Sequence, residues 1–471
     1  MWAEEYKDCL KFIDSYWDKI IHKPAGMAVR GKIINHIPYL HGKEIKKNLN
    51  LVEIPYAYIV PNDRKFTYIF YWDTFFMFRG LMGTKRQWIM KEMVNNFMYL
   101  FEKYGVIPNF NAPVSLGRSQ PPFLTTMILD TYFCALDGAG KGFREKLFSR
   151  YFFGKERDWF EKAIQTAKQE YETVWIDGPN VYNHHVAGYS LSRYGDRDVG
   201  YAHSSELESG WDFTSRFYNR CNQFLPVDLN TLLYKYETDF AYVAQLLGKK
   251  DDEQVWKDKS DSRKREMNNL MWNEEEGFFY DYGWYSQKQS DFLSLAGFVP
   301  MWAGLASYDQ AKKMVKKLNK FETKYGLTIT AKESLAKPID LSKIQKRYHP
   351  AIEEIIQPKQ WDYPHIWSPL EYLTVIGLLR YGFIDDAKRI MHASIAAHAA
   401  LFREYGTFFE KINAETGKPG VHFHYENQTG FGWTNAAFYR YIQILDALDK
   451  NHSIYKESLD TEPPYHLTIL Y

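Results

Sequence analysis

Cysteine is scarce in this 471-residue chain, and its three copies are far apart in the sequence. Cys9, Cys134 and Cys221 form no C-x-x-C pair, which argues against a cysteine-based zinc site and against a disulfide-stabilised scaffold. Unpaired cysteines are typical of proteins in reducing compartments. The expected location is therefore the cytoplasm.

The chain also lacks an excess of charge of either sign and a long apolar run. Its 59 Lys and Arg residues nearly balance its 58 Asp and Glu residues, so no net field favours nucleic acid or an anionic membrane as a partner. In residues 1–21 apolar side chains recur at helical spacing between charged ones, which predicts an amphipathic helix and not a signal peptide or a membrane span. We expect no nucleic acid and no membrane partner, and a neutral partner fits the charge balance better.

No Pro- or Ser-rich linker, low-complexity tract or compositional break divides the chain, so residues 1–471 are expected to form one domain. The helical pattern recurs from end to end, whereas strand signals such as 276–285 are short and isolated. We predict helices at 84–105, 123–138, 156–175, 227–248, 252–272, 368–382, 384–406 and 434–450. The expected class is all-α, and about a dozen helices joined in pairs suggest a toroid of α-hairpins among the possible large helical folds. The least regular stretch, 320–360, is a candidate active-site loop.

The stretch SELESGWDFTSRF (205–217) gathers acidic residues around a Gly-Trp pair. Cleavage of a glycosidic bond needs one protonated carboxylic acid and one carboxylate. Asp212 directly follows Trp211, and a carboxyl group held against a large apolar ring keeps its proton near neutral pH. The alternative is that Ser209 or Asp212 caps a helix that begins at 213, and from this stretch alone the cap is the simpler interpretation.

Three further segments combine aromatic rings with polar groups. FYWDTFF (70–76) places Asp73 after Trp72, and QWDYPHIWSP (360–369) repeats the pattern with Trp361 and Asp362. The loop IPNFNAPVSLGRSQPPF (107–123) adds Asn109, Arg118 and Gln120. Such a mixture suits a neutral polyol, because donors and acceptors bind the hydroxyl groups and flat rings cover the apolar sugar face. Core packing is the alternative role for any single ring, the two tryptophans included.

These segments, together with FLPVDLNTLLYKYE (224–237) and GFGWTN (430–435), resemble the motifs of trehalase, glycoside hydrolase family 37, in order from about residue 60 to 440. The resemblance implies an (α/α)6 toroid that hydrolyses an α-glucoside with inversion and without a metal or cofactor, with trehalose as the best single substrate. It also implies Asp212 as general acid and Glu410, in FFEKIN before GFGWTN, as general base. A solvated loop position is the alternative for Glu410. The resemblance further implies sugar-binding roles for Phe66, Trp72, Asp73, Asn109, Arg118, Gln120, Gly210, Trp361 and Asp362.

The sequence departs from the family pattern mainly around the leaving group. PNDRKF stands where Pro-Gly-Gly-Arg-Phe is usual, so Lys65 replaces an arginine and Arg64 precedes it, and a lysine offers a point charge instead of a planar fork. The Pro-Arg-Pro-Glu-Ser-Tyr motif for the second glucose is absent, and Arg193 and Arg197 in 184–201 are candidate substitutes. Glu426 stands two residues after the position of another expected glutamate. The subsite for the cleaved glucose is thus retained and the leaving-group subsite is rebuilt.

A rebuilt leaving-group subsite permits other substrates. Family 63 relatives that hydrolyse glucosylglycerate or mannosylglycerate share the toroid and the two carboxyl roles, and their acidic aglycone would favour basic residues such as Lys65, Arg193 or Arg197. A small neutral or mildly acidic sugar is the expected substrate.

Two alternatives come from other functional classes. One is a metal hydrolase that uses His422, His424 and Glu426, which the lack of an H-E-x-x-H helix or a cysteine pair disfavours. The other is a sugar-binding protein without activity, which the presence of both Asp212 and Glu410 disfavours.

Overall fold

The structure is a computed structural model. It describes residues 2–24, 51–137, 155–176, 184–195, 202–336, 358–421 and 425–450. Arg197, His422, His424 and residues 337–357 of the predicted loop 320–360 lie outside the described residues.

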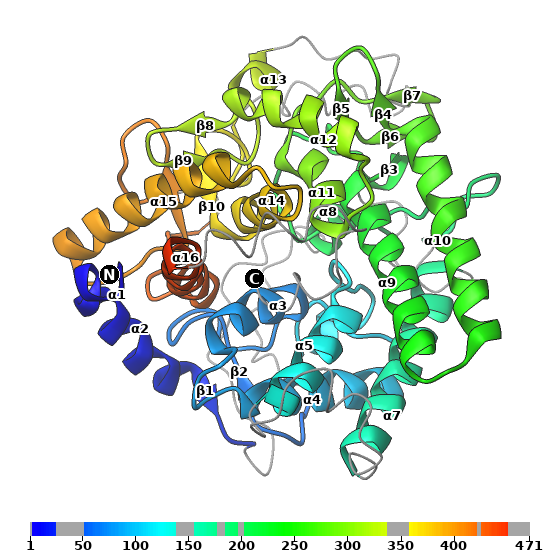
Figure 1. The fold of residues 1–471 in the computed structure, drawn as a ribbon, viewed down its shortest axis with the longest axis horizontal. Helices are drawn as coiled ribbons and strands as arrows, with labels where there is room; N and C mark the ends of the chain where they lie inside the picture. Colours follow the sequence, from blue (N-terminus) through cyan, green and yellow to red (C-terminus); the bar gives the residue numbers. More distant parts are fainter. Residues whose placement is uncertain are drawn as a thin grey trace.

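An inner layer of helices forms a closed ring (Figure 1). Its members are α3 (Tyr71–Leu81), α5 (Leu124–Asp137), α9 (Val227–Leu246), α11 (Val299–Ala303), α14 (Ser368–Arg380) and α16 (Gly432–Lys450). Each of these helices contacts the next one, and α16 returns to α3. The ring confirms the predicted all-α class and the (α/α)6 toroid.

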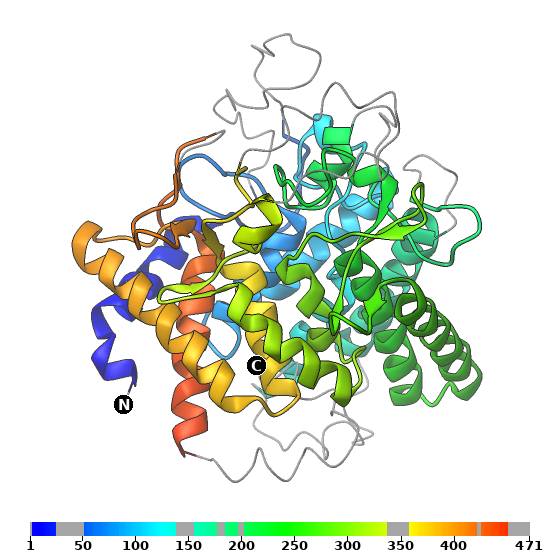
Figure 2. The same ribbon diagram turned by 90° about the horizontal axis from the view of Figure 1, so that it is seen from above.

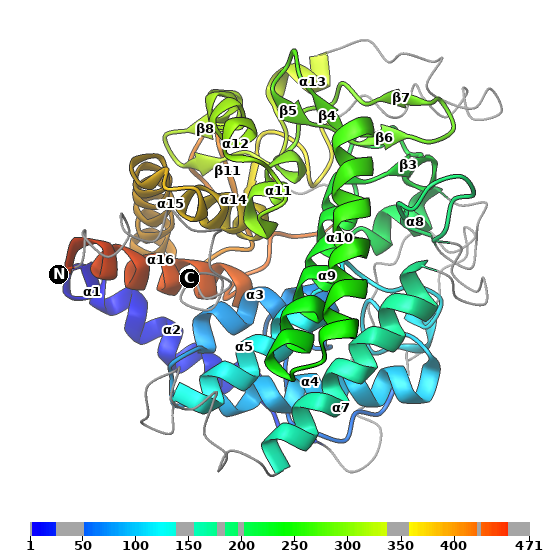
Figure 3. The ribbon, with the colours of Figure 1, turned by 45° about the vertical axis from the view of Figure 1, so that its right-hand side comes forward.

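An outer layer of helices covers the ring. It contains α2 (Lys7–Ile20), α4 (Trp88–Tyr104), α7 (Lys155–Glu170), α10 (Lys250–Leu270) and α15 (Ile384–Tyr405), which contact α16, α3, α5, α9 and α14 respectively. Figure 3 shows the long hairpin of α9 and α10, and Figure 2 shows α14 (yellow), α15 and α16 (red-orange) alongside one another. None of the helices in the described ranges has both the length and the apolar character of a membrane span.

The two layers differ in which faces they bury. Every residue of α14 is buried, whereas α10 buries only Trp256, Ser260, Arg263 and Met267 and turns its charged residues outward. A helix enclosed on all sides needs apolar residues all round, while a covering helix needs one apolar stripe. The inner ring is therefore rigid scaffolding for side chains that project from its ends.

The remaining elements are short. The short helices are α1 (Trp2–Glu5), α8 (Ala202–Glu208), α12 (Tyr308–Val315) and α13 (Lys332–Ala336), with a π-turn at Tyr171–Ile176 and 3₁₀ turns at Pro113–Ser115, Cys221–Gln223, Leu295–Phe298 and Lys316–Lys320. The strands are β1 (Ile21–His22), β2 (Tyr58–Ile59), β3 (Phe224–Leu225), β4 (Trp272–Asn273), β5 (Phe278–Phe279), β6 (Tyr282–Gly283), β7 (Lys288–Gln289), β8 (Glu322–Thr323), β9 (Gly326–Leu327), β10 (His365–Trp367) and β11 (Lys411–Asn413). They pair antiparallel as β1–β2, β3–β6–β7, β4–β5, β8–β9 and β10–β11.

The predicted long helices are all present within a few residues, as are the amphipathic N-terminal helix and short strands in 276–285. Five helices of the described ranges were not predicted: α3, α8, α11, α12 and α13. In α3 every residue is buried, so its sequence has no polar face and shows no helical period. Of the predicted loop 320–360, the first part contains β8, β9 and α13.

Candidate active site

Five tryptophans meet where α3, α14 and α16 begin. Trp361 stacks on Trp367 with ring centroids 4.0 Å apart, and its centroid lies 5.5 Å from Trp72, 5.8 Å from Trp211 and 6.2 Å from Trp433. All five side chains are buried. Trp72 and Trp361 therefore do pack into the core, and the same cluster forms a rigid apolar wall beside the acidic motif.

Beside these tryptophans, the acidic motif has a backbone conformation with positive φ that only certain residues tolerate. Gly210 has φ +76°, and a Cβ atom there would lie 2.7 Å from the indole of Trp72. Asp212 has φ 39°, also in the left-handed region. Glycine at 210 is required because a side chain would displace Trp72 and strain the turn.

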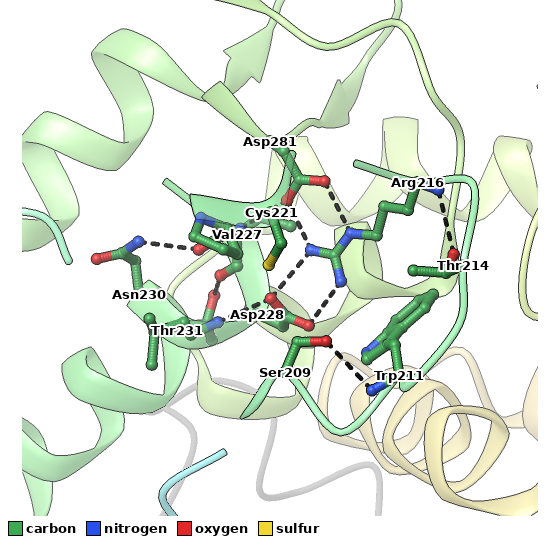
Figure 4. Close-up of polar contacts among 12 residues, drawn as sticks. Ser209, Trp211, Thr214, Arg216, Cys221, Val227, Asp228, Asn230, Thr231 and Asp281 are labelled. Atoms are coloured by element: carbon green, nitrogen blue, oxygen red, sulfur yellow. Dashed lines mark hydrogen bonds and ion pairs between the residues drawn. The ribbon is translucent and has the colours of Figure 1, made fainter. Parts of the chain in front are cut away.

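The helix-cap alternative for this motif is wrong. Residues 211–220 form no helix, and the first helical turn after the motif is Cys221–Gln223. The Ser209 hydroxyl instead accepts a hydrogen bond from the Trp211 amide at 3.2 Å (Figure 4). The local polar groups thus build a loop that presents Asp212.

The charged residues around Asp212 each have a partner elsewhere. Arg216 donates to Asp228 (2.7 and 2.9 Å) and to Asp281 (2.8 and 2.6 Å), and it lies over the Trp211 ring (Figure 4). Glu206 accepts from the Thr214 amide at 2.7 Å. Within the described ranges the Asp212 carboxyl makes no hydrogen bond or ion pair. It is therefore the acidic group of this motif that remains available for chemistry.

The protonation of Asp212 suits a general acid. Burial raises the pKa of Asp212 to about 7, although the nearby Arg118 guanidinium acts in the opposite direction. The carboxylates of Glu410 and Glu206 raise it further. A carboxyl group with this pKa still carries a proton near neutral pH and can give it to a leaving group.

Glu410 is buried at the start of β11 and is held by two donors. Its Oε2 lies 2.9 Å from the ammonium of Lys411, and its Oε1 accepts from the Tyr425 hydroxyl at 2.9 Å. Its amide donates to Gln428 O at 2.9 Å. The alternative of a solvated loop residue is wrong, since the Glu410 side chain is 1% exposed. An ammonium and a phenol stabilise the negative charge that a base must carry.

Sequence reasoning missed Lys411 and Tyr425. Both are next to predicted site residues: Lys411 follows Glu410, and Tyr425 precedes Glu426. The signal for Lys411 was the Glu-Lys pair itself. The contact of Tyr425 with Glu410 spans 15 residues and arises only in the folded chain.

Asp73 is a third carboxyl group in the same neighbourhood. Burial and the negative charges of Asp212 and Glu410 hold the pKa of Asp73 well above its ordinary value. The mutual influence of these three groups shows that α3, the acidic motif and β11 bring them together. A protonated Asp73 can donate a hydrogen bond to a sugar hydroxyl.

The predicted loop 107–123 wraps against α3 and α8. Gln120 Oε1 accepts from the Trp72 amide at 3.1 Å, and Asn109 Nδ2 donates to Leu207 O at 3.1 Å. Arg118 is buried and its charge acts on Asp212. The structure thus brings Arg118 to the acid, while the visible contacts of Asn109 and Gln120 hold the loop.

Asp362 supports the acid loop from the other side. Its carboxylate accepts from Thr214 Oγ1 (2.9 Å), from the amide and hydroxyl of Ser215 (2.9 and 2.6 Å) and from the Lys359 amide (2.9 Å). The Trp361 amide donates to Phe213 O at 3.0 Å. Both oxygens of Asp362 serve the segment that follows Asp212.

The residues predicted to bind the leaving group do not lie together. Lys65 lies beside Tyr425, whereas Arg193 lies beside Asn222. The ammonium of Lys65 lies 4.6 Å from the centroid of the Tyr425 ring, and burial lowers the pKa of Lys65 while Glu410 and Glu426 oppose this. Phe66 packs edge-on against Tyr425. Arg64 and Glu426 are exposed. Arg193 is buried beside Asn222, to whose carbonyl it donates at 2.8 Å, and lies over the Trp284 ring.

Comparison with known proteins identifies the family of this chain. The family model described as Trehalase matches residues 32–209 and 200–446. The chain belongs to the trehalase family. The chain is 29% identical to a probable trehalase of Eremothecium gossypii over 479 aligned residues, which cover 87% of this chain and 60% of that relative. This trehalase-family chain therefore spans about 60% of the length of that curated protein.

Solved structures share the fold of this trehalase-family chain. Neutral trehalase Nth1 from Saccharomyces cerevisiae superposes with a TM-score of 0.74 at 23% identity, covering 97% of this chain and 96% of that one. A family 63 mannosylglycerate hydrolase from Thermus thermophilus in complex with glucose gives a TM-score of 0.52 at 17% identity, covering 82% and 95%. At these identities the likeness concerns the toroid.

Proposed function

We propose that this trehalase-family protein hydrolyses the α-glucosidic bond of trehalose, with inversion, to two molecules of glucose. The observation that carries the proposal is the contrast between Asp212 and Glu410. Burial raises the pKa of Asp212 to about 7, so a large share of this group carries its proton near neutral pH, whereas Lys411 and Tyr425 donate to the Glu410 carboxylate. Two carboxyl groups whose surroundings favour opposite charge states are what acid and base catalysis of glycoside hydrolysis requires.

In the proposed mechanism Asp212 gives its proton to the oxygen that bridges the two sugars. Glu410 takes a proton from a water molecule on the opposite face of the cleaved glucose. The water oxygen bonds to the anomeric carbon as the bond to the bridging oxygen breaks, so the configuration inverts. Room for that water requires carboxyl groups about 6.5–9.5 Å apart.

The proposed subsite for the cleaved glucose is built from the residues around these two groups. A protonated Asp73 and the Arg118 guanidinium would bind hydroxyl groups, and Phe66 and Trp72 would cover the apolar sugar face. Asn109, Gln120, Trp361 and Asp362 stay in the proposal as residues that shape or line this pocket. Gly210 contributes by admitting Trp72.

A second candidate substrate has an acidic aglycone, as in glucosylglycerate or mannosylglycerate. Lys65 favours it, because its ammonium is half-buried beside Glu410 and has no ion-pair partner in the part of the chain that the structure describes. A carboxylate on the leaving group would supply that partner. Arg193 and Arg197 are the other basic candidates for this subsite.

Release of glucose from trehalose, and of glucose or mannose from the two glycerates, tests both candidates. Trehalose should be cleaved fastest, and D212N and E410Q should release no sugar above background. A faster reaction with a glycerate would replace trehalose by the second candidate. Binding without release from any of the three would favour a non-catalytic sugar-binding protein. We also propose the cytoplasm as its location, because the buried Cys9 and Cys221 form no disulfide within the described residues.

A further inference from the structure

Glu208, the last residue of α8, is a buried carboxylate that holds three separate segments. Its Oε1 accepts from the Ser119 amide at 2.8 Å, and its Oε2 accepts from the Gly195 amide at 2.6 Å. The same Oε2 lies 2.8 Å from Nε2 of His184. The other ring nitrogen of His184 lies 2.7 Å from Val174 O, which can only accept, so Nδ1 carries a proton.

The hydrogen bond from the Ser119 amide joins α8 to the loop 107–123. The neighbouring carbonyl, Leu207 O, accepts from Asn109 Nδ2 at 3.1 Å. Within the loop, the Asn109 amide donates to Arg118 O at 3.1 Å, and the Ser119 hydroxyl donates to Ile107 O at 2.7 Å. Leu207 and Glu208, which are consecutive in α8, therefore bind both ends of the loop that contains Arg118.

Asp212 follows Glu208 by only a short turn, so the same helix end also sets the position of the acid. We propose that Glu208 is a positioning residue that fixes the Arg118 guanidinium beside the general acid Asp212. The inference rests on the proposed function, since Asp212 must be the acid for the effect to appear in catalysis. Glu208 itself touches no reacting atom in this account; it acts through Ser119 and Arg118.

The consequence is electrostatic. Arg118 is the group that most strongly opposes the rise in the pKa of Asp212, Glu410 and Glu206 act in the other direction, and Lys411 is the second cation. Asp73 and Tyr425 also lie close enough to feel the charge of Asp212. If Arg118 moves away, the pKa of Asp212 must rise, and the acid keeps its proton to higher pH.

Glu206 provides a matched control on the same helix. Both glutamates are fully buried, but Glu206 accepts one backbone hydrogen bond through one oxygen, from Thr214, and lies 3.7 Å from Lys359. A glutamine at 206 can keep the Thr214 contact with its carbonyl oxygen. At 208 both oxygens accept from amides, so in E208Q at least one donor loses its acceptor. E208L fills a similar volume and removes every acceptor.

The experiment is the pH dependence of kcat/KM on trehalose for the wild type, E208Q, E208L and E206Q. The limb at high pH reports loss of the proton from the acid. It should rise in the order wild type, E208Q, E208L, by about one pH unit in E208L, because an opposite charge lowers a pKa by roughly 1–3. In E206Q it should not rise, because removal of a neighbouring negative charge lowers the pKa of Asp212. An unchanged limb in folded E208L overturns the inference. If E208L does not fold, E208A replaces it, because alanine also removes both acceptors, and an unchanged limb in that variant overturns the inference equally.

A second measurement does not need activity. Arg118 is buried, and the amide after it is held by Glu208, so trypsin should spare this bond in the wild type and E206Q. Cleavage after Arg118 should appear in E208L at a temperature well below its Tm. Equal protection in all variants contradicts the positioning role. A wild type that is protected but cleaves none of the candidate sugars would instead refute the proposed function.

Discussion

The site has two sides, one at the end of α8 and one at β11, and each side places a carboxyl group in different surroundings. On the α8 side, Glu206 and Arg216 of the acidic motif bind partners elsewhere, whereas the partly buried Asp212 carboxyl has no hydrogen-bond partner among the described residues. Desolvation raises the pKa of Asp212 to about 7. On the β11 side, Glu410 is more deeply buried than Asp212 but accepts hydrogen bonds from an ammonium and a phenol. In the proposed mechanism, the donors that each side supplies determine which carboxyl group is the acid and which is the base.

The largest expected effect on kcat comes from replacing either of the two carboxyl groups, Asp212 or Glu410. D212N cannot donate a proton to the leaving oxygen, and E410Q cannot accept one from water. Each should lower kcat by on the order of 10²-fold or more. Steady-state glucose release, with circular dichroism to show that the variants fold, is the measurement. Near-full activity in either variant would mean that the role assigned to that carboxyl group is wrong.

A smaller effect is expected from the donors that make the β11 side different. Y425F removes one hydrogen bond to the charged Glu410, and such bonds are worth about 1.5–3 kcal/mol, so kcat should fall on the order of tenfold. K411M removes the buried positive charge and should lower kcat more than Y425F. Equal kcat for Y425F and the wild type would show that the phenol is not needed to hold the base.

The two sides should also respond with opposite signs when stability is measured. The raised pKa of Asp212 means that its ionised form opposes folding above the unfolded pKa, and this penalty grows as pH rises to about 7. D212N should therefore raise Tm by about 2 °C at pH 8 and by less at pH 5. An asparagine also tolerates the left-handed backbone at 212.

E410Q should lower Tm instead, because it leaves the buried ammonium of Lys411 without its partner, a loss of about 3–5 kcal/mol. A drop of roughly 5 °C or more is expected. Differential scanning calorimetry of both variants at pH 5 and pH 8 checks the pair. The same sign of change in both variants would contradict the contrast between the two sides.

The smallest effect on trehalose cleavage is expected from changes at Arg64 and Lys65. R64A changes an exposed side chain and should alter kcat/KM less than about twofold. K65M removes the half-buried charge beside Glu410 and should impair glycerate substrates more than trehalose. Competition assays with the three substrates measure this. Equal losses for K65M and R64A on every substrate would remove the argument for an acidic aglycone.

The outer helices could be predicted from the sequence because each has one apolar stripe. The buried helix α3 was missed, because its 11 residues leave no polar face and it is shorter than the 13-residue α14, which is equally buried but was predicted. Asp212 and Glu410 could be predicted from a resemblance in ordered motifs. The side chains that surround them in the structure could not be predicted in this way. The Ser119–Glu208 contact spans 89 residues and the Thr214–Asp362 contact spans 148 residues, so neither leaves a local pattern in the sequence.

The most direct test of the central claim is proton NMR of the protein mixed with trehalose, followed before mutarotation blurs the anomeric signals. Trehalose contains two α-linked anomeric carbons, and inversion at one of them releases equal early amounts of α- and β-glucose. The account predicts these equal amounts, with no early signal for D212N. Early α-glucose alone would mean retention and would contradict the role of Glu410 as a base that activates water.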